Sequence, residues 1–474
     1  MLLSRRNLIR SAASVAIAAP SLQLLAGCAE PERPSVNRRV SSLALNPDPK
    51  GLLDLAPGLA YTVISRTGDK MADGFVEPAA HDGMAAFPVE GDPDRCLLVR
   101  NHELSPGAEA SSAFGADGAG AAAIASRIYD HTPGGRPNPG GATTVLVDLR
   151  NLRAERTHLS LAGTIRNCAG GPTPWGSWLS CEETETNPGL VATKHHGFVF
   201  EVPAAGGLAD PVPLTGLGRF AHEACAVDPA TGIVYLSEDT GDSLFYRFLP
   251  NARGELAKGG RLQAMAFVVK SGADTRNWDP AAGIYLPNVA QEVRWIDLDH
   301  VDAPNADLRQ RGRAKGAAIF ARGEGLAFAL EASGSAVYFA CTSGGPAKLG
   351  QVWRYRPSLH EGTSREADAP GTMSLFVESH ADSEFDMVDN IVASPRGELI
   401  MCEDGGGDQF VRAVAPDGLI YPIARNADAG KSEFAGCCFS PDGRVLFANI
   451  QRPGITLAIT GDWAALRRNA KAAA

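Results

Sequence analysis

The sequence predicts an all-β fold, a six-bladed β-propeller with short helical and loop insertions. The chain contains 52 glycines and 32 prolines, which favour many turns over long helices. Its hydrophobic content of 44% is ample for a large core. One unit also recurs along the chain: an apolar strand, a Pro/Gly turn, and a second apolar strand that ends in polar residues.

Six copies of this unit can be recognised. They are HDGMAAFPVEGDPDRCLLVRNHE (81–103), TIRNCAGGPTPWGSWLSCEE (164–183), HEACAVDPATGIVYLSED (222–239), EGLAFALEASGSAVYFACTSG (324–344), DNIVASPRGELIMCED (389–404) and EFAGCCFSPDGRVLFANIQ (433–451). Turn chemistry and β-branched and aromatic residues predict a β-hairpin for each. Six similar hairpins favour propeller blades around a channel, whereas a pair of β-sandwiches would not need similar hairpins. We expect LAYTVISRTG (59–68) to pair with ITLAIT (455–460) and close the ring.

Residues 1–27 have the pattern of an export signal, in which a basic cluster precedes an apolar run too short to span a bilayer. Ser4–Arg6 with Leu8 resembles a twin-arginine signal, and Leu25–Cys28 resembles a lipobox whose cysteine would be acylated. We expect export by the twin-arginine pathway to the periplasm or cell surface, with a lipid on Cys28 as a membrane tether. Cleavage by an ordinary signal peptidase is the alternative.

The rest of the chain is expected to form one domain. Its length alone would suggest two or three domains, but no linker divides it. We expect residues 28–50 to be a flexible linker and residues 51–474 to be a single β-propeller domain. The Gly/Ala-rich stretch 106–141 contains hydrophobic turns, so it is interpreted as an insertion.

The net charge and the cysteines indicate which binding partners and which cross-links to expect. The formal net charge is −10 and the leader is basic, so nucleic-acid binding is not expected. We expect a monomer that acts on a small molecule. The nine cysteines have irregular spacing and no CxxC motif, so no disulfide pairing follows. Most lie in apolar runs, where a cysteine is usually a small buried hydrophobe, but Cys181 and Cys402 each precede a glutamate.

The hairpins also predict which polar residues meet, because the residue that begins the first strand lies across from the residue that ends the second. The expected neighbours are Asp82 with Asn101 and His102, Asn167 with Glu182, Glu223 with Glu238, Glu324 with Thr342, Asp389 with Glu403, and Glu433 with Asn449 and Ile450. In a propeller these ends share one rim at the channel mouth. Polar strand ends that simply face water are the alternative.

Carboxylates that converge repel one another unless they are protonated or neutralised by cations. Oxygen ligands suit Ca²⁺ and Mg²⁺, whereas the thiol of Cys181 beside carboxylates points to a transition metal. The rim therefore predicts a site for several metal ions.

The stretch Asn167–Glu183, NCAGGPTPWGSWLSCEE, closely resembles a signature of the PhoX-type alkaline phosphatases. Further segments follow in the order of that family, and the resemblance covers most of the chain after the leader. These segments are Asn101–Glu103, Gly218–Glu223, Arg322–Glu324, Gly350–Tyr355 and the hairpin turn Pro441–Gly443. The first signature is long enough to be specific, whereas each of the others alone is weak.

The resemblance implies a six-bladed propeller that hydrolyses phosphate monoesters with a mixed Fe³⁺ and Ca²⁺ cluster. By resemblance, Cys181 is the iron-ligating thiolate, Glu182 is its neighbouring ligand, and Arg322 holds the phosphate. The metal ligands expected by resemblance or by hairpin position are Cys181, Glu182, Glu223, Glu324, Asn101, Glu103, Glu238, Asp239, Glu403 and Asp404. Arg219 either holds substrate phosphate or forms a structural ion pair. His102 and His222 either carry protons or pack structurally.

Two other functions remain open at this point. A calcium-dependent, lactonase-like propeller hydrolase would use the carboxylate rim without a thiolate. A binding protein whose metals are purely structural would use the same rim without turnover. The chain is shorter than the larger phosphatases, so its substrate range need not be theirs.

Overall fold

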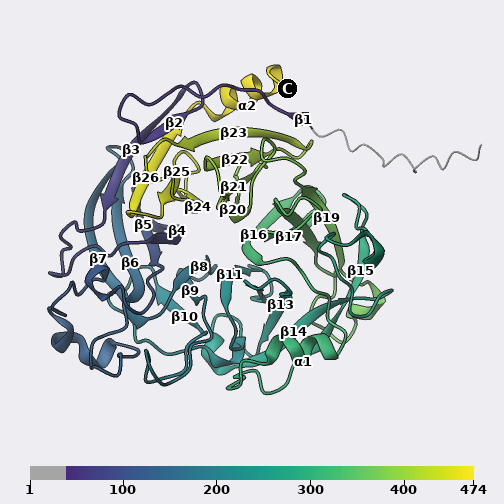
Figure 1. The fold of residues 1–474 in the computed structure, drawn as a ribbon, viewed down its shortest axis with the longest axis horizontal. Coiled ribbons are helices and arrows are strands. Elements are labelled where there is room, and N and C mark those ends of the chain that lie inside the picture. The colour runs from purple at the N-terminus through teal and green to yellow at the C-terminus, as the bar shows by residue number, and fades with distance from the viewer. Residues whose placement is uncertain (1–38) are drawn as a thin grey trace, which may run out of the picture. The chain divides into compact units, whose positions relative to one another are not determined.

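The computed structural model describes residues 39–474, which belong to one compact unit. The predicted leader, Cys28 and residues 28–38 of the predicted linker lie outside the described residues. The unit is all-β and propeller-like: its sheets stand around a common centre, with β4, β8, β11, β16, β20 and β24 innermost (Figure 1). No helix within residues 39–474 is long and apolar enough to cross a membrane.

The strands form five hydrogen-bonded sheets, two of which have four strands. In the first, β4 (His81–Val89), β5 (Asp92–His102), β6 (Gly140–Asp148) and β7 (Arg153–Thr164) follow one another. The second is ordered β24 (Phe434–Phe439), β25 (Leu446–Ile450), β26 (Ile455–Gly461) and β3 (Leu59–Arg66). In the latter, Ile459 pairs with Tyr61 in an antiparallel ladder. The predicted pairing of 59–68 with 455–460 is therefore confirmed.

Two further sheets have three and six strands. The three-stranded sheet contains β8 (Asn167–Pro172), β9 (Ser177–Glu182) and β10 (Val199–Pro203). The six-stranded sheet contains β1 (Arg39–Val40), β2 (Leu53–Leu55), β20 (Val388–Ala393), β21 (Leu399–Glu403), β22 (Phe410–Val414) and β23 (Leu419–Asn426). Both β1 and β2 pair with β23. Residues 39–50, which were predicted to be part of the linker, thus belong to the folded unit.

The fifth sheet has nine strands, and two consecutive meanders join in it. One meander is β11 (His222–Val227), β12 (Val234–Glu238), β13 (Tyr246–Pro250), β14 (Gly260–Phe267) and β15 (Gln291–Asp297). The other is β16 (Gly323–Glu331), β17 (Gly334–Cys341), β18 (Gln351–Arg356) and β19 (Thr372–Glu378). They meet where β15 pairs with β19 at Gln291 and Met373. Two α-helices, α1 (Leu308–Ala314) and α2 (Trp463–Ala472), are described.

The six predicted hairpins are all present, and they share one irregularity. They are β4–β5, β8–β9, β11–β12, β16–β17, β20–β21 and β24–β25, each antiparallel. In every one, the register shifts just after the start of the first strand. Such a bulge bends the strand and redirects side chains. The repeated unit therefore repeats this local distortion as well as the hairpin.

Small residues lie within the bulge because neighbouring inner strands approach closely there. A Cβ on Gly83 would lie 2.5 Å from Cα of Ala169, and one on Gly436 would lie 2.3 Å from the carbonyl oxygen of Asp82. Residues of all six inner strands, these glycines included, line a central cavity of about 350 Å³. The glycines thus let the sheets close around a narrow centre.

Gly325→Ala is expected to destabilise the fold. Its Cβ would lie 2.5 Å from the carbonyl oxygen of Asp389 and 2.7 Å from the amide nitrogen of Ile391, so backbone would have to move. We expect the free energy of unfolding, measured in denaturant, to fall by about 1–3 kcal/mol. Gly207→Ala is the control, because its Cβ meets no atom within 4 Å. Equal stability of the two variants would contradict the packing argument.

Candidate metal centre

The inner strands bring acidic residues and one thiol together at one end of the ring. In five hairpins, the acidic or thiol side chain belongs to the residue that directly follows the first paired residue of the hairpin. These residues are Asp82, Cys168, Glu223, Glu324 and Asp389. Successive side chains of a strand point to opposite faces, so this position faces away from the paired residue before it. Five different strands therefore contribute to one centre.

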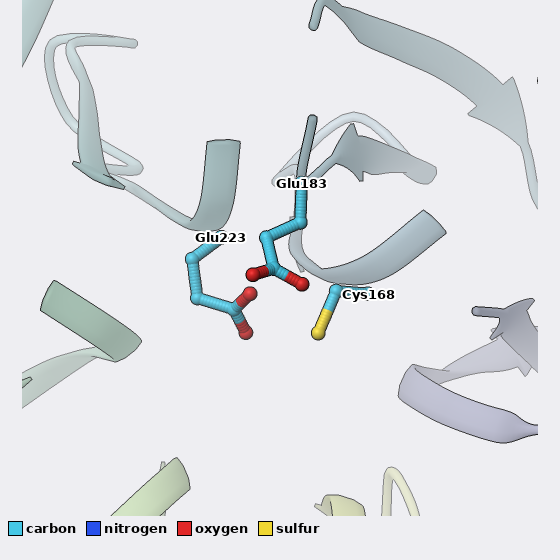
Figure 2. A group of neighbouring side chains, drawn as sticks. All are labelled: Cys168, Glu183 and Glu223. Atoms are coloured by element: carbon cyan, nitrogen blue, oxygen red, sulfur yellow. The ribbon is translucent and has the colours of Figure 1, made fainter. Parts of the chain in front are cut away.

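Two groups of side chains are arranged as metal ligands. Ligand atoms of Cys168, Glu183 and Glu223 lie within 4.8 Å of one another, and those of Glu223, Glu324 and Asp389 do the same. Figure 2 shows the first group, with the thiol of Cys168 and both carboxylates pointing toward one another. Because Glu223 belongs to both groups, the two potential sites are adjacent.

Glu223 is the most informative member of the centre. Its side chain is fully buried, and neither carboxylate oxygen has a hydrogen-bond partner among residues 39–474. Burial raises its pKa well above the usual range, the nearby carboxylates of Asp389 and Glu183 raise it further, and the nearby thiol of Cys168 offsets part of this rise. Buried polar groups almost always have partners, so two orphaned oxygens point to a ligand that the protein itself does not supply. A cation between the two groups would satisfy them.

The pKa values of the other acids of the centre are raised for the same reasons. Burial raises the pKa of Glu324 and Asp389 well above the usual range, with further contributions from neighbouring carboxylates. The pKa of Asp82 rises to about 7, mainly by burial and then by Glu103. That of Glu433 rises to about 11, by burial and by Asp404. So many uncompensated acids favour bound cations over an empty site.

A second set of side chains comes from the residues that directly follow the second strands. In four hairpins these are Glu103, Glu183, Asp239 and Asp404. Each backbone N–H donates to the carbonyl of the residue just before the first strand: Glu103 to Ala80 (3.0 Å), Glu183 to Arg166 (2.9 Å), Asp239 to Ala221 (3.1 Å) and Asp404 to Met387 (3.0 Å). The backbone therefore holds these carboxylates at equivalent places.

Two arginines link the acids of neighbouring hairpins. Arg166 Nη2 lies 2.9 Å from Glu103 and also contacts Glu183. Arg322 donates from Nε and Nη2 to both oxygens of Asp239, at 2.9 and 3.0 Å, and from Nη2 to Glu324 at 2.8 Å. The two side chains are 36% and 32% exposed, so an anion can still reach them. They place positive charge directly beside the acidic centre.

The structure places Cys181 and Glu182 outside both ligand groups. Cys181 lies in a hydrophobic cluster with residues such as Leu179, outside both ligand groups. Glu182 accepts hydrogen bonds from the N–H of Ile165 and of Gly197, both at 2.9 Å, and contacts Nδ1 of His196 at 2.6 Å. Its oxygens are thus occupied, and the neighbouring Glu183 lies in the centre instead.

Glu238 and Glu403 occupy the same place as Glu182 in their hairpins and are likewise engaged. Glu238 accepts from Nη1 of Arg309 and from the hydroxyl of Tyr246, both at 2.8 Å. Glu403 accepts from Nε of Arg412 at 2.5 Å. As with Glu182, the residue that follows each glutamate, Asp239 or Asp404, belongs to the centre. These two glutamates, predicted as metal ligands, therefore also lie outside both ligand groups.

Asn101 is held within the scaffold rather than presented to the centre. Its Oδ1 accepts from Nε1 of Trp178 at 3.0 Å and from Oγ of Ser180 at 2.8 Å. Its Nδ2 donates to the carbonyl of Ala169 at 2.7 Å. The side chain, which was predicted to be a ligand, thus ties the hairpin β4–β5 to the hairpin β8–β9.

Arg219 is a structural residue, although not in the ion pair considered above. It is fully buried, and its guanidinium donates to the carbonyls of His196 (2.7 Å), Glu185 (2.7 Å) and Ala303 (3.0 Å). It clamps loops together and has no exposed surface for a phosphate. Its predicted catalytic role is therefore not supported by its position.

The two histidines pack structurally, as one of the two interpretations held. Nε2 of His222 lies 3.0 Å from the carbonyl oxygen of Gly218, and burial lowers its pKa to about 3. His102 is buried between Oγ1 of Thr143 (2.8 Å) and the carbonyl of Ala79 (3.0 Å). Neither side chain is placed to carry protons at the centre.

Sequence reasoning placed some members of the centre at the rim and missed others. Asp82, Asp389 and Glu433 were expected at the channel mouth, but not as ligands. Arg166, Cys168 and Glu183 were not assigned, although all three lie in or beside the family-like signature. The repeated pattern of the hairpins could have found them, because each occupies the position of a functional residue in another hairpin.

Comparisons with known proteins identify the family and support the fold. The model of the family described as alkaline phosphatase PhoX matches residues 40–454. The chain is similar to the structure of Pseudomonas fluorescens PhoX in complex with vanadate, a transition state analogue, with a TM-score of 0.65 and 18% identity over 90% of this chain and 98% of that one. A gluconolactonase from Xanthomonas campestris has a TM-score of 0.39 and 11% identity, over 86% of this chain and 98% of its own.

No curated protein matches the chain. The likeness to the P. fluorescens structure supports the propeller-like fold, whereas the family match covers nearly all described residues. By that match, the chain belongs to the PhoX family of alkaline phosphatases.

Proposed function

We propose that this protein hydrolyses phosphate monoesters at a multi-metal centre formed by the ends of its inner hairpins. The observation that carries the proposal is Glu223, a buried carboxylate shared by two ligand groups and without any partner for its two oxygens. Family membership supports the reaction class. The six hairpins with one shared register shift support six blades, with the nine-stranded sheet contributing two of them.

The two ligand groups differ in their donor atoms. Glu223, Glu324 and Asp389 offer only oxygen, which suits Ca²⁺. The group with Cys168 adds a soft sulfur donor, which favours a transition metal, and we assign Fe³⁺ to it. The thiolate role expected for Cys181 thereby passes to Cys168. The chemistry that such ions supply is neutralisation of phosphoryl charge and activation of water at ordinary pH.

The chain's own residues bind and orient the substrate. Arg166 and Arg322 offer planar donors that match phosphoryl oxygens, and Glu103 and Asp239 keep their guanidinium groups in place. Phosphoryl transfer depends mainly on such positioning and on electrostatic stabilisation, so no further nucleophilic side chain is required.

We further propose export through the leader at residues 1–27, with Cys28 as the lipid-bearing residue, and a monomeric enzyme. The motifs near Arg5 and Cys28 support the first two points. A small phosphoester is the expected substrate, because the arginines present a compact anion site.

The proposal predicts metal-dependent turnover of a chromogenic phosphate monoester. Chelation should abolish activity, and elemental analysis of the active protein should find iron and calcium together. Cys168→Ala should lower kcat/KM by about 100-fold or more, because one metal group loses its sulfur ligand. The matched control is Cys181→Ala, which also removes a buried thiol but should retain activity.

Loss of activity in Cys181→Ala together with retention in Cys168→Ala would overturn the assignment of the thiolate. Metal-loaded protein that turns over lactones and no phosphoester would favour the lactonase-like alternative. If chelation lowers Tm and neither substrate class is turned over, the metals are structural.

Arg322→Lys tests the anion site. A lysine keeps the charge but loses the planar pair of donors, so we expect kcat/KM to fall by about 10- to 100-fold. Inhibition by inorganic phosphate should weaken in parallel. The control is Arg95→Lys, because Arg95 also donates twice to one carboxylate, Glu155, at 2.8 Å, but from the far end of β5. Similar kinetics for both variants would argue against substrate contact by Arg322.

The raised pKa values predict how metal-free protein responds to pH. Burial and nearby carboxylates raise the pKa of Asp82 to about 7, and burial together with Glu103 and Asp239 raises that of Glu183 to about 8 despite Arg166. The folded state then binds protons that the unfolded chain has released, so stability falls as pH rises between about 4 and 8. With chelator present, Tm should therefore decrease from about pH 5 to about pH 8.5.

Metal-loaded protein should lack this decrease, because cations replace the protons, and the gap between loaded and chelated protein should widen with pH. Chelated protein that is equally stable at both ends of this range would contradict the convergence of unneutralised acids.

A further inference from the structure

Two pairs of thiols lie at equivalent positions of the repeat, outside the proposed metal centre. Sγ of Cys181 is 3.4 Å from Sγ of Cys225, and Sγ of Cys402 is 2.9 Å from Sγ of Cys437. All four cysteines are buried. Each pair joins the second strand of one hairpin to the first strand of the next hairpin along the chain.

The equivalence of the pairs can be followed residue by residue. Cys181 and Cys402 directly precede Glu182 and Glu403, which end the ladders of β9 and β21. Their partners occupy the third position after the residue that starts the next ladder, His222 for Cys225 and Phe434 for Cys437. The same contact between neighbouring hairpins therefore occurs twice in the ring.

In both cases the two thiols belong to different sheets. The pair at Cys181 connects the three-stranded sheet with the nine-stranded sheet, and the pair at Cys402 connects the six-stranded sheet with the four-stranded sheet that holds β24. A covalent bond at either place would link sheets that side-chain packing now holds together.

We propose that Cys181–Cys225 and Cys402–Cys437 are sites of disulfide formation, which bond neighbouring sheets when the protein meets a small-molecule disulfide. A disulfide places its sulfurs about 2 Å apart. The observed separations, 3.4 and 2.9 Å, are short enough for side-chain rotation to close them. The two thiols of a pair are therefore already directed at each other.

The central cavity gives an oxidant a route to both pairs. Cys225 and Cys437 line this cavity, which has a volume of about 350 Å³ and a mainly apolar wall. One thiol of each pair, Cys225 or Cys437, can thus attack a small disulfide from the interior of the ring, and its partner thiol lies buried next to it.

The reaction is thiol–disulfide exchange. The sulfur of the first cysteine attacks one sulfur of the small disulfide, whose S–S bond breaks and releases one thiol, with the cysteine proton passing to it through water. The second cysteine then attacks the resulting mixed disulfide and releases the other thiol in the same way. The protein loses two electrons and two protons for each bridge, and the small disulfide gains them.

The test uses full-length protein and oxidised glutathione. After incubation, the protein is denatured, its free thiols are alkylated, and peptides are mapped by mass spectrometry without reduction. We expect cross-linked peptides for Cys181–Cys225 and Cys402–Cys437, an intact mass lower by two hydrogen atoms per bridge, and alkylation of the other described cysteines: Cys96, Cys168, Cys341 and Cys438. Bridges that close intervals of 44 and 35 residues should raise Tm by about 5 °C or more, reversibly on reduction.

Two variants sharpen the test. Cys402→Ser should remove one bridge only, leaving Cys437 open to alkylation and Cys181–Cys225 linked. Cys341→Ser is the control, because Cys341 is buried without a partner thiol in the described chain, and both bridges should still form. Complete alkylation of all four paired cysteines after oxidation, links between other pairs, or glutathione adducts alone would overturn the proposal. Peptide mapping of the oxidised protein without substitutions decides the question even if a variant does not fold.

Discussion

The structure depends on holding like charges from different hairpins at one point. The carboxylates of the centre are buried, and each raises the pKa of its neighbours. Two arginines offset part of this charge, but both oxygens of Glu223 remain without a partner in residues 39–474. Cations would replace both the missing hydrogen bonds and the missing positive charge. Cation binding at this centre would therefore be coupled to folding, because only the folded chain brings the ligands together.

A one-residue alternation divides structural from functional side chains. At the end of the second strand in four of the hairpins, one residue is engaged by hydrogen bonds within the scaffold and the next one faces the centre. The pairs in this order are His102 and Glu103, Glu182 and Glu183, Glu238 and Asp239, and Glu403 and Asp404. The first member fixes the strand end by hydrogen bonds and ion pairs, and so it positions the second. Adjacent acids in the sequence thus have different tasks.

This alternation explains which features of the site the sequence could predict and which it could not. Turn chemistry and repetition were sufficient to predict the hairpins, their polar ends and the closing pair of strands. They could not decide which of two adjacent acids, such as Glu182 and Glu183, faces the centre, because a shift of one residue exchanges the faces of a strand. The bulge at the start of each hairpin adds such a shift. Arg166 and Cys168 were missed for a related reason, since neither residue type matched the acidic pattern.

The two arginines also show that backbone strain is a poor guide to function in this fold. Arg166 and Arg322 have left-handed φ values of 51° and 54°, which in a residue with a side chain often mark an active site. However, Ala80 and Met387 occupy the same place in their hairpins with φ values of 52° and 50°. The left-handed turn therefore recurs in four hairpins, where the carbonyl of this residue accepts from the amide of the residue that follows the second strand. The two arginines differ from Ala80 and Met387 in their charge. Their role follows from the acids that they contact and the anions that they can bind.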